Sequence, residues 1–408
     1  MKRRPVQSAA ATLFDAPRDW HGRTLYIMRT GSQTLGEARR DMLLAGGWLA
    51  HGHGLGPGKR VCLWLPKGYL AASVMLGAIA IGACYVPLDY NGPIDRQLAI
   101  LDQVEPHLLV TTPTLARRLT LSRPDGLACP VATVEEGGFP TAQPLVRPIE
   151  MDDSAPAVIF FTSGSTGTPK GIVASRRGMA ETVSRAIDVL SLSEGDRLLF
   201  HPPLHYSSSI TLFSPLYAGC STFILSDQEA LFPDVVAGII DKHRITVWQG
   251  AASYLRALVG GGNLQRRNLS SVRFFDFFGE RLPASIVAEA QRHFAKAHFC
   301  NTYGSSEAFW ITHYDVPRPL ADLDAELPIG KPYDAFKLSL RDRQGREVEA
   351  GEAGEICVEG PVLLDSYWGD AEQTRSVRLD GNARTYRTGD FARPGADGNL
   401  NFLGRRDL

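Results

Sequence analysis

Residues 157–171 read AVIFFTSGSTGTPKG, an apolar run of strand type that ends directly in hydroxyl side chains, glycines and one lysine. The helix-patterned run GMAETVSRAIDVL follows at 178–190. Backbone N–H groups and hydroxyls in such a segment can surround the oxygens of a phosphate. It is not a Walker A loop, because Pro169 precedes the lysine and Gly171 follows it. A flexible surface linker is the alternative, although linkers seldom follow a buried strand directly.

Apolar, β-rich runs of the same kind recur from about residue 35 to 300 and alternate with helix-patterned stretches. They are RVCLWLP (60–66), CYVPLD (84–89), LLVTT (108–112), RLLFHPP (197–203), STFIL (221–225), ITVWQG (245–250), RFFDFFG (273–279) and HFCNTYG (298–304). This alternation predicts parallel sheets covered by helices, and the number of strands favours two α/β units. The Pro/Gly/Asp-bearing stretch 121–156 is the expected seam between them.

Beyond about residue 325 the pattern changes to short strands and turns, with Asp397-Gly398 offering a tight hairpin turn. We therefore predict an α/β fold with two stacked α/β subdomains, mainly parallel sheets and a small C-terminal antiparallel β subdomain. The expected divisions are 1–150, 151–324 and 325–408.

Composition excludes several classes of protein. The chain of 408 residues carries 43 Lys+Arg and 44 Asp+Glu, a net charge of 43 − 44 = −1, so neither nucleic acid nor an anionic membrane is expected to hold it by its net field. Its six cysteines are scattered singly, which predicts neither a disulfide framework nor a zinc site. The sequence shows no signal-peptide pattern and no 18-residue apolar stretch, so a soluble, cytoplasmic protein is expected.

Two further segments carry candidate binding residues. Asn301-Thr302-Tyr303-Gly304-Ser305-Ser306-Glu307 follows a strand-like run and offers an aromatic ring, hydroxyl donors and a carboxylate suited to Mg²⁺. Asp390, with Phe402 and Arg405 nearby in sequence, could accept hydrogen bonds from a pair of hydroxyls. Taken singly, the first is equally a Tyr-Gly turn with a helix-capping Glu, and the second a pair of hairpin turns.

Together and in this order, these segments resemble the adenylate-forming (AMP-binding) superfamily. The resemblance covers residues from about 35 to the end and includes LGAIAIGACYVPLD (76–89) and GEICVEGPVLLDSYW (354–368). It is greatest to the N-terminal core of a peptide-synthetase-type adenylation domain or of an aryl- or acyl-CoA synthetase. The resemblance implies an ATP- and Mg²⁺-dependent ligase that joins a carboxylate to the α-phosphorus of ATP and releases pyrophosphate.

The resemblance also implies roles for individual residues. The loop residues Thr162, Ser163, Gly164, Ser165, Thr166, Gly167 and Lys170 would hold the β- and γ-phosphates. Tyr303 would stack on adenine, with Asn301, Gly279, Glu280 and Arg281 at its edge and Thr302, Gly304 and Ser305 in the same nucleotide-binding segment. Ser306 would contact the α-phosphate, Glu307 would bind Mg²⁺, and Asp390 would bind the ribose with Arg405 and Phe402 beside it.

The chain departs from the family pattern in three places. Members carry a catalytic lysine in a small C-terminal domain beyond a hinge aspartate, whereas here Asp407 fits the hinge and the sequence ends at Leu408. We expect a sequence cut at the hinge, with a naturally minimal protein as the alternative, and low turnover in either case because that lysine is absent. Arg176 stands where relatives often have His, and Ser306 replaces a usual Thr.

The segment His205-Tyr206-Ser207-Ser208 bears on the substrate. Tyr206 stands where amino-acid-activating relatives have the aspartate that binds an α-ammonium group, so an ordinary α-amino acid is not expected. His205 resembles the gate residue of aryl- and acyl-CoA synthetases and is the candidate catalytic residue; the alternative is a satisfied histidine at a strand end. The projected acid pocket comprises Tyr206, Ser207, Ile210, Gln249, Asp276, Phe278, Thr302, Trp310 and Ile311. Its large rings favour a small or flat acid.

Asp276 lies among four phenylalanines in FFDFF (274–278) and needs either an internal partner or a cationic ligand. The alternative is that strand alternation directs it to an arginine or a helix N-terminus.

The leading hypothesis is activation of a small carboxylic acid, including a non-α amino acid, for transfer to the phosphopantetheine thiol of an acyl or peptidyl carrier protein in nonribosomal peptide synthesis. The alternatives are a CoA ligase core, with the CoA thiol as acceptor, and a catalytically inactive nucleotide-binding module.

Overall fold

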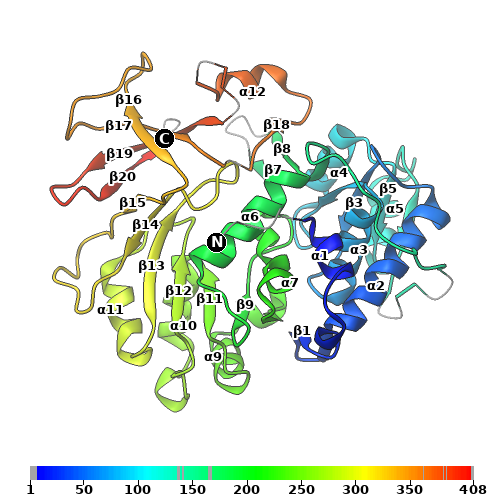
Figure 1. Cartoon of the computed structure of the whole chain (residues 1–408), viewed down its shortest axis with the longest axis horizontal. Helices are drawn as coiled ribbons and strands as arrows, with labels where there is room; N and C mark the ends of the chain where they lie inside the picture. The colour runs from blue at the N-terminus through cyan, green and yellow to red at the C-terminus, as the bar shows by residue number, and fades with distance from the viewer. Residues whose placement is uncertain are drawn as a thin grey trace.

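The computed structural model describes residues 7–135, 138–139, 142–163, 168–361, 363–379, 381–382 and 384–405. Within these residues the strands form three sheets, and Figure 1 shows them with the helices that cover them. The predicted fold class, mixed α/β with large, mainly parallel sheets and a small antiparallel sheet, is confirmed.

In the described residues the largest sheet has nine strands, in the order β15-β14-β13-β12-β11-β9-β10-β1-β2. Their bounds are β15 Lys331–Pro332, β14 Thr312–Asp315, β13 His298–Tyr303, β12 Phe274–Phe277, β11 Val247–Gly250, β9 Arg197–Phe200, β10 Ser221–Ile224, β1 Thr24–Met28 and β2 Gly31–Thr34. The strands from β13 to β1 in this order run parallel. Their carboxyl ends therefore meet at one edge of the sheet.

A second sheet, of seven strands among the described residues, has the order β18-β8-β7-β4-β3-β5-β6. Its strands are β18 Ser366–Tyr367, β8 Pro169–Ser175, β7 Pro156–Ser163, β4 Cys84–Pro87, β3 Arg60–Trp64, β5 Leu108–Thr111 and β6 Val131–Thr133. The antiparallel four-stranded sheet near the C-terminus comprises β16 Lys337–Arg341, β17 Gly354–Glu359, β19 Thr385–Pro394 and β20 Leu400–Arg405, in that order.

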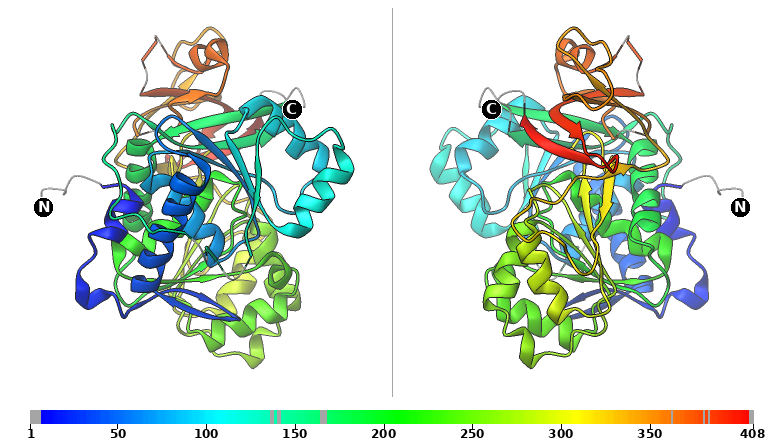
Figure 2. Two further views of the ribbon diagram at one scale, coloured as in Figure 1. Left: turned by 90° about the vertical axis from the view of Figure 1, so that its right-hand side faces the viewer. Right: turned by 90° about the vertical axis from the view of Figure 1, so that its left-hand side faces the viewer.

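The α-helices lie mainly on the faces of the two large sheets (Figures 1 and 2). They are α1 Ala9–Phe14, α2 Leu35–Gly47, α3 Tyr69–Ala80, α4 Ile94–Val104, α5 Pro113–Ser122, α6 Arg176–Val189, α7 Ser214–Ala218, α8 Asp227–Ala230, α9 Pro233–Lys242, α10 Ala252–Gly261, α11 Ala284–His293 and α12 Ala371–Ser376. Several helices begin at a residue whose side chain caps the first turn. The Ser175 hydroxyl, for example, accepts a hydrogen bond from the backbone N–H of Gly178 and caps α6. No helix of the described part of the chain is both long and apolar enough to cross a bilayer.

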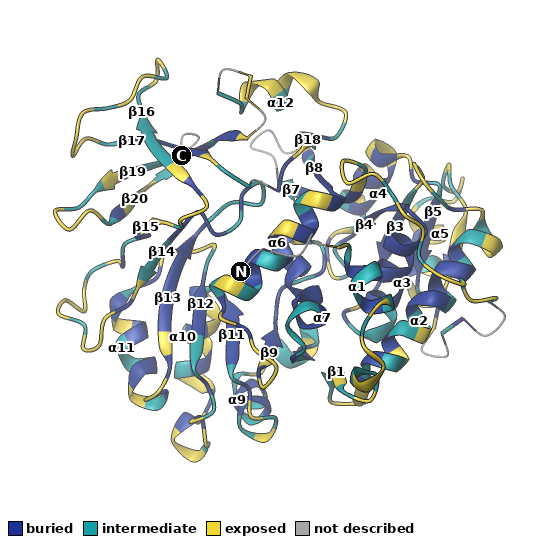
Figure 3. Ribbon diagram, in the orientation of Figure 1, coloured by how far each residue is buried: buried dark blue, intermediate teal, exposed yellow. Residues whose placement is uncertain are grey.

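Helix α6 lies between the two large sheets. Its Met179 and Val183 pack in the same core as Phe160 of β7, whereas residues near its C-terminal end pack with Leu198 and Val247 of the nine-stranded sheet. Figure 3 shows the strands around it as the buried interior and the exposed residues at the periphery. Burial on both faces explains why the strands read as continuous apolar runs.

Strand β8 was not predicted. Strands β7 and β8 pair antiparallel, with Thr162 opposite Lys170 and Ser163 opposite Pro169. Gly171 is required in β8, because a Cβ there would lie 2.9 Å from both the Phe161 ring and the Trp368 side chain. A second strand of the same sheet therefore lies between β7 and helix α6.

The sheets do not separate at residue 150. Strands β7 and β8, at residues 156–175, complete the sheet of β3–β6, whereas β1 and β2 extend the nine-stranded sheet through the pairing of β1 with β10. The division of the chain into 1–150, 151–324 and 325–408 stays a prediction, and each large sheet contains strands from both sides of its first boundary.

Candidate active site

A cleft of about 1350 Å³ lies where the carboxyl ends of the central strands face the small antiparallel sheet. Most of the predicted site residues line it: Thr162, Lys170, His205, Tyr206, Ser207, Gly279, Glu280, Arg281, Asn301, Thr302, Tyr303, Gly304, Ser305, Ser306, Glu307, Asp390, Phe402 and Arg405. Segments more than 200 residues apart in the sequence thus meet in one space. Gly164, Ser165, Thr166 and Gly167 lie outside the described residues, as does the side chain of Ser163.

The four-stranded sheet supplies a carboxylate to the cleft. Asp390 on β19 is opposite Arg405 on β20, and the Tyr303 hydroxyl donates to its Oδ2 at 2.7 Å. Arg405 Nε lies 3.2 Å from Oδ1 but off the hydrogen-bond direction, so Oδ1 has no hydrogen-bond donor among the described residues. Burial raises the pKa of Asp390, opposed by Tyr303 and Arg405. One carboxylate oxygen is therefore left to accept a ligand hydroxyl.

An aromatic wall lies beside this carboxylate. The ring of Tyr303 is 6.1 Å from that of Phe402, and the Arg281 guanidinium lies 5.5 Å from the Phe402 ring and pairs with Glu326 at 2.5 Å. Flat surfaces of this kind suit a stacked base.

Two predicted residues at this edge are already engaged by the protein. The Asn301 amide donates to the carbonyl of Pro328 at 2.8 Å, and the Glu280 carboxylate accepts the N–H and hydroxyl of Ser253 at 2.8 and 2.9 Å. These bonds shape the rim of the cleft.

Glu307 is held rigidly. Tyr367 donates its hydroxyl to Oε1 at 2.8 Å, and the Glu307 backbone carbonyl accepts the N–H groups of Leu363 and Leu364 at 2.8 and 3.0 Å. Carboxylate oxygens placed in this way are suitable ligands for Mg²⁺. Tyr367 was not singled out in the sequence, although it lies within the family-like segment 354–368.

His205 lies at the junction of the large cleft and a smaller cavity of about 210 Å³, since both spaces share Asp89, His205 and Tyr206. Its Nδ1 is 3.7 Å from Asp89 Oδ1, and its ring meets that of Tyr206 edge-on at 4.6 Å. Burial lowers the pKa of His205 despite Asp89, so the imidazole is neutral at pH 7. Asp89 was missed, although it lies two residues beyond the strand CYVP (84–87) and the rule applied to other strand ends would have found it.

The remaining acid-pocket residues, Ile210, Gln249, Asp276, Phe278, Trp310 and Ile311, do not line the cleft. Asp276 is fully buried; its Oδ2 accepts Gln249 Nε2 at 2.9 Å and Trp310 Nε1 at 3.0 Å. These bonds come neither from an arginine nor from a helix N-terminus. Asp276 Oδ1 and Gln249 Oε1 have no hydrogen-bond partner among the described residues.

The surroundings of Asp276 disfavour its charge. Burial raises its pKa, opposed by the hydrogen bonds from Trp310 and Gln249 and by the nearby Thr302 side chain, which makes no hydrogen bond of good geometry to the carboxylate. Thr302 interacts with this buried carboxylate and also lines the cleft. A polar group entering the cleft past Thr302 would meet an unsatisfied acceptor.

Comparison with known proteins agrees with this geometry. Residues 13–368 match the family described as AMP-binding enzyme. An L-proline--[L-prolyl-carrier protein] ligase of Pseudomonas fluorescens is 27% identical over 87% of this chain and 70% of its own length. A dimodular nonribosomal peptide synthase of Bacillus subtilis is 30% identical over 87% of this chain, which spans only 15% of that synthase.

Solved structures show the same fold. The nonribosomal peptide synthetase FmoA3 in its AMPPNP-bound form superposes with a TM-score of 0.87 at 26% identity, covering 99% of this chain and 43% of FmoA3. The anthranilate CoA ligase AuaEII with anthranoyl-AMP gives 0.88 at 21% identity, covering 99% and 79%. The resemblance seen in the sequence is thereby confirmed, and the chain belongs to the AMP-binding enzymes, the adenylate-forming ligases.

Proposed function

We propose that this chain activates a small carboxylic acid with ATP, forming an acyl-adenylate for transfer to the phosphopantetheine thiol of a carrier protein. The observation that carries the proposal is the meeting in one cleft of Lys170, Tyr303, Glu307 and Asp390. Donors for phosphate, a flat ring, a metal-binding oxygen and a hydroxyl acceptor together fit a nucleoside triphosphate.

The residues present fit ATP and Mg²⁺. Asp390 Oδ1 is available for a ribose hydroxyl, Tyr303 and Phe402 for the base, Thr162 and Lys170 for the phosphates and Ser306 for the α-phosphate. Glu307 would hold Mg²⁺, which neutralises charge on the phosphate oxygens when bound.

A carboxylate oxygen of the acid would then attack the α-phosphorus while pyrophosphate leaves with the bonding electron pair. For this displacement the protein contributes mainly orientation and electrostatic stabilisation.

The acid is proposed to be small, and to carry an amino group placed differently from that of an α-amino acid. Tyr206 is 55% exposed at the mouth of the cleft and supplies no carboxylate there. The buried Asp276, with one unpartnered oxygen behind Thr302, is the acceptor that an ammonium group could satisfy.

A CoA ligase core is the second candidate. The neutral His205 beside the cleft and the absence of a carboxylate at position 206 favour it. Transfer of the activated acid to CoA, rather than to a protein-bound thiol, would identify this function.

Calorimetric titration with ATP tests the nucleotide site. We expect Mg²⁺-dependent heat that Asp390→Asn and Glu307→Gln each weaken by roughly 10-fold, as for loss of one charged hydrogen bond or ligand. Glu289→Gln, on the outer helix α11, is the matched control and should bind as the wild type does. A flat titration of the folded wild-type chain at millimolar ATP would refute the nucleotide site.

A further inference from the structure

Arg185 of α6 is buried, with 8% of its surface exposed. Its Nη2 donates to the carbonyls of Phe309 and of Trp310, the latter at 2.9 Å, and its Nη1 donates to the Pro361 carbonyl at 3.1 Å. The guanidinium also lies 4.5 Å from the Phe336 ring. Burial lowers its pKa to about 10, so it stays charged at neutral pH. Burying a guanidinium is unfavourable unless its N–H groups donate hydrogen bonds, and here they donate to three main-chain carbonyls.

Two of these carbonyls, those of Phe309 and Trp310, belong to the turn between β13 and β14. Gly304 begins this turn where a Cβ would lie 2.9 Å from the Ala308 carbonyl and the Trp310 N–H. Trp310 ends it with φ of 49°, a left-handed conformation that costs about 1–3 kcal/mol for a non-glycine residue. A conformation of this kind persists only when surrounding contacts impose it, and Arg185 supplies two of them.

The same turn connects the cleft with the buried Asp276. Its middle carries Ser305, Ser306 and Glu307 into the space proposed for ATP, and its end carries the Trp310 indole to Asp276 Oδ2 at 3.0 Å. The indole N–H is one of two donors that orient this carboxylate, the other being Gln249.

We propose that Arg185 is a positioning residue that sets acid specificity: it holds Trp310 so that the indole fixes Asp276 with its free oxygen available to the substrate amine. This inference rests on the proposed function, because it takes Asp276 as the acceptor for the acid. A merely structural Arg185 would affect all acids alike, whereas a positioning residue changes the preference between acids.

The test measures acid binding rather than turnover. Calorimetry with a non-hydrolysable ATP analogue and Mg²⁺ compares 3-aminobutanoate with 3-methylbutanoate, which has a methyl group in place of the ammonium group. We expect Arg185→Met to lower the ratio of the two affinities by roughly 10-fold, because only the amine uses Asp276. Arg177→Met, on the exposed side of the same helix, is the matched control and should leave the ratio unchanged.

A double-mutant cycle locates the effect. If Arg185 acts through Trp310, adding Trp310→Phe to Arg185→Met should change the ratio little further. Should Arg185→Met fail to fold by circular dichroism, Arg185→Lys carries the same test, since lysine cannot bind all three carbonyls at once.

Equal losses for both acids, or additive effects of the two substitutions, would overturn the role of Arg185 alone. A folded wild-type chain that binds the ATP analogue but neither acid would instead refute the proposed acid site, and the inference with it.

Discussion

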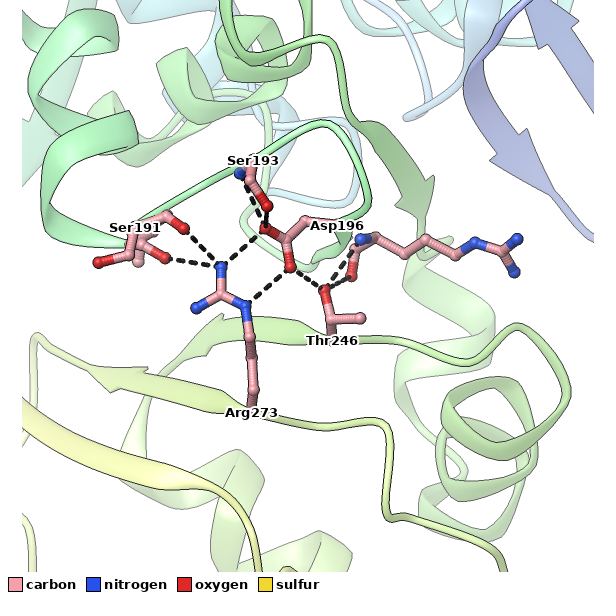
Figure 4. A network of polar contacts seen from close by, with 7 residues as sticks. Ser191, Ser193, Asp196, Thr246 and Arg273 are labelled. Carbon is pink, nitrogen blue, oxygen red and sulfur yellow. Dashed lines mark hydrogen bonds and ion pairs between the residues drawn. The ribbon is translucent and has the colours of Figure 1, made fainter.

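The two ends of the nine-stranded sheet treat a buried carboxylate in opposite ways. At the amino ends, Asp196 accepts Arg273, Thr246 and the N–H and hydroxyl of Ser193, all at 2.6–2.8 Å (Figure 4). At the carboxyl ends, Asp276 receives two neutral donors on one oxygen and none on the other. The pKa values of the two carboxyls differ accordingly. Burial favours a higher pKa in both, but the hydrogen bonds that Asp196 accepts from Arg273 and from the hydroxyls outweigh burial and lower its pKa to about 2. The pKa of Asp276 stays raised.

This difference distinguishes a buried carboxylate that stabilises the fold from one that can bind a ligand. A carboxylate whose oxygens are both satisfied within the protein stabilises the fold and has no capacity left for a ligand. A buried carboxylate with one oxygen that receives no hydrogen bond lowers the stability of the fold, and such destabilising groups are typical of binding sites. Substitutions at one end of the sheet at a time can test this difference.

Asp196→Asn should have the largest effect, because an amide nitrogen cannot accept the donors around it. We expect a loss of about 2–3 kcal/mol in the free energy of unfolding at pH 7, measured by urea titration. Asp153→Asn, at an exposed ion pair with Arg177, is the control and should change stability by less than about 0.5 kcal/mol.

The loss at Asp196 should also depend on pH. The pKa of Asp196 is about 2 in the folded chain against 3.8 for an unperturbed aspartate, so its contribution is present above pH 3.8 and disappears as the pH falls through 2. The difference between wild type and Asp196→Asn should therefore be constant from pH 7 to 5 and shrink below pH 4. A difference that grows on acidification would contradict the assignment.

Asp276→Asn should have the next largest effect, on acid recognition. It keeps the side-chain volume and an oxygen for Gln249 and Trp310 but removes the charge. The affinity for amine-bearing acids should fall roughly 10- to 100-fold, with little change for neutral acids of the same shape. If benzoate-like acids bind best and the substitution changes nothing, the amine proposal fails and an aryl acid is favoured.

The smallest effect is on stability, and its sign is opposite to that at Asp196. A carboxyl with a raised folded-state pKa stabilises the fold below pH 3.8 and loses that contribution as the pH rises through its folded pKa. Asp276→Asn should therefore stabilise the chain at pH 7, by about 1 kcal/mol, or roughly 1–2 °C in Tm, and this gain should vanish near pH 4. A clear loss of Tm at pH 7 would show that the carboxylate is satisfied after all.

Much of the fold could be predicted because strands buried on both faces leave unbroken apolar runs. Strand β8 could not, since PKGIVAS (169–175) begins with Pro and Lys and contains a glycine that only the contacts of Phe161 and Trp368 explain. The pairing of β1 with β10 was also missed, because hydrophobic periodicity and β-propensity do not show which strands pair with each other.

The candidate site divides in the same way. Residues at the carboxyl ends of strands, such as Tyr303 at the end of β13, could be named from the sequence, and their grouping could be expected from the meeting of strand ends. Asp276, inside β12, was named through the family resemblance. The hydrogen bond from Trp310 to Asp276 and the hydrogen bonds from Arg185 to three main-chain carbonyls could not be predicted, because they depend on the directions of side chains on separate elements.

The exchange of strands between the large sheets has a consequence for how the chain folds. Thr24–Met28 must wait for Ser221–Ile224 to be synthesised before it can pair, and Cys84–Pro87 must wait for Pro156–Ser163. Contacts of such long sequence separation slow folding. A fragment ending at residue 150 would expose the unpaired side of β4, and a fragment beginning there would expose that of β10. Expression of either half alone should thus yield an aggregation-prone chain, and co-expression of both should restore solubility.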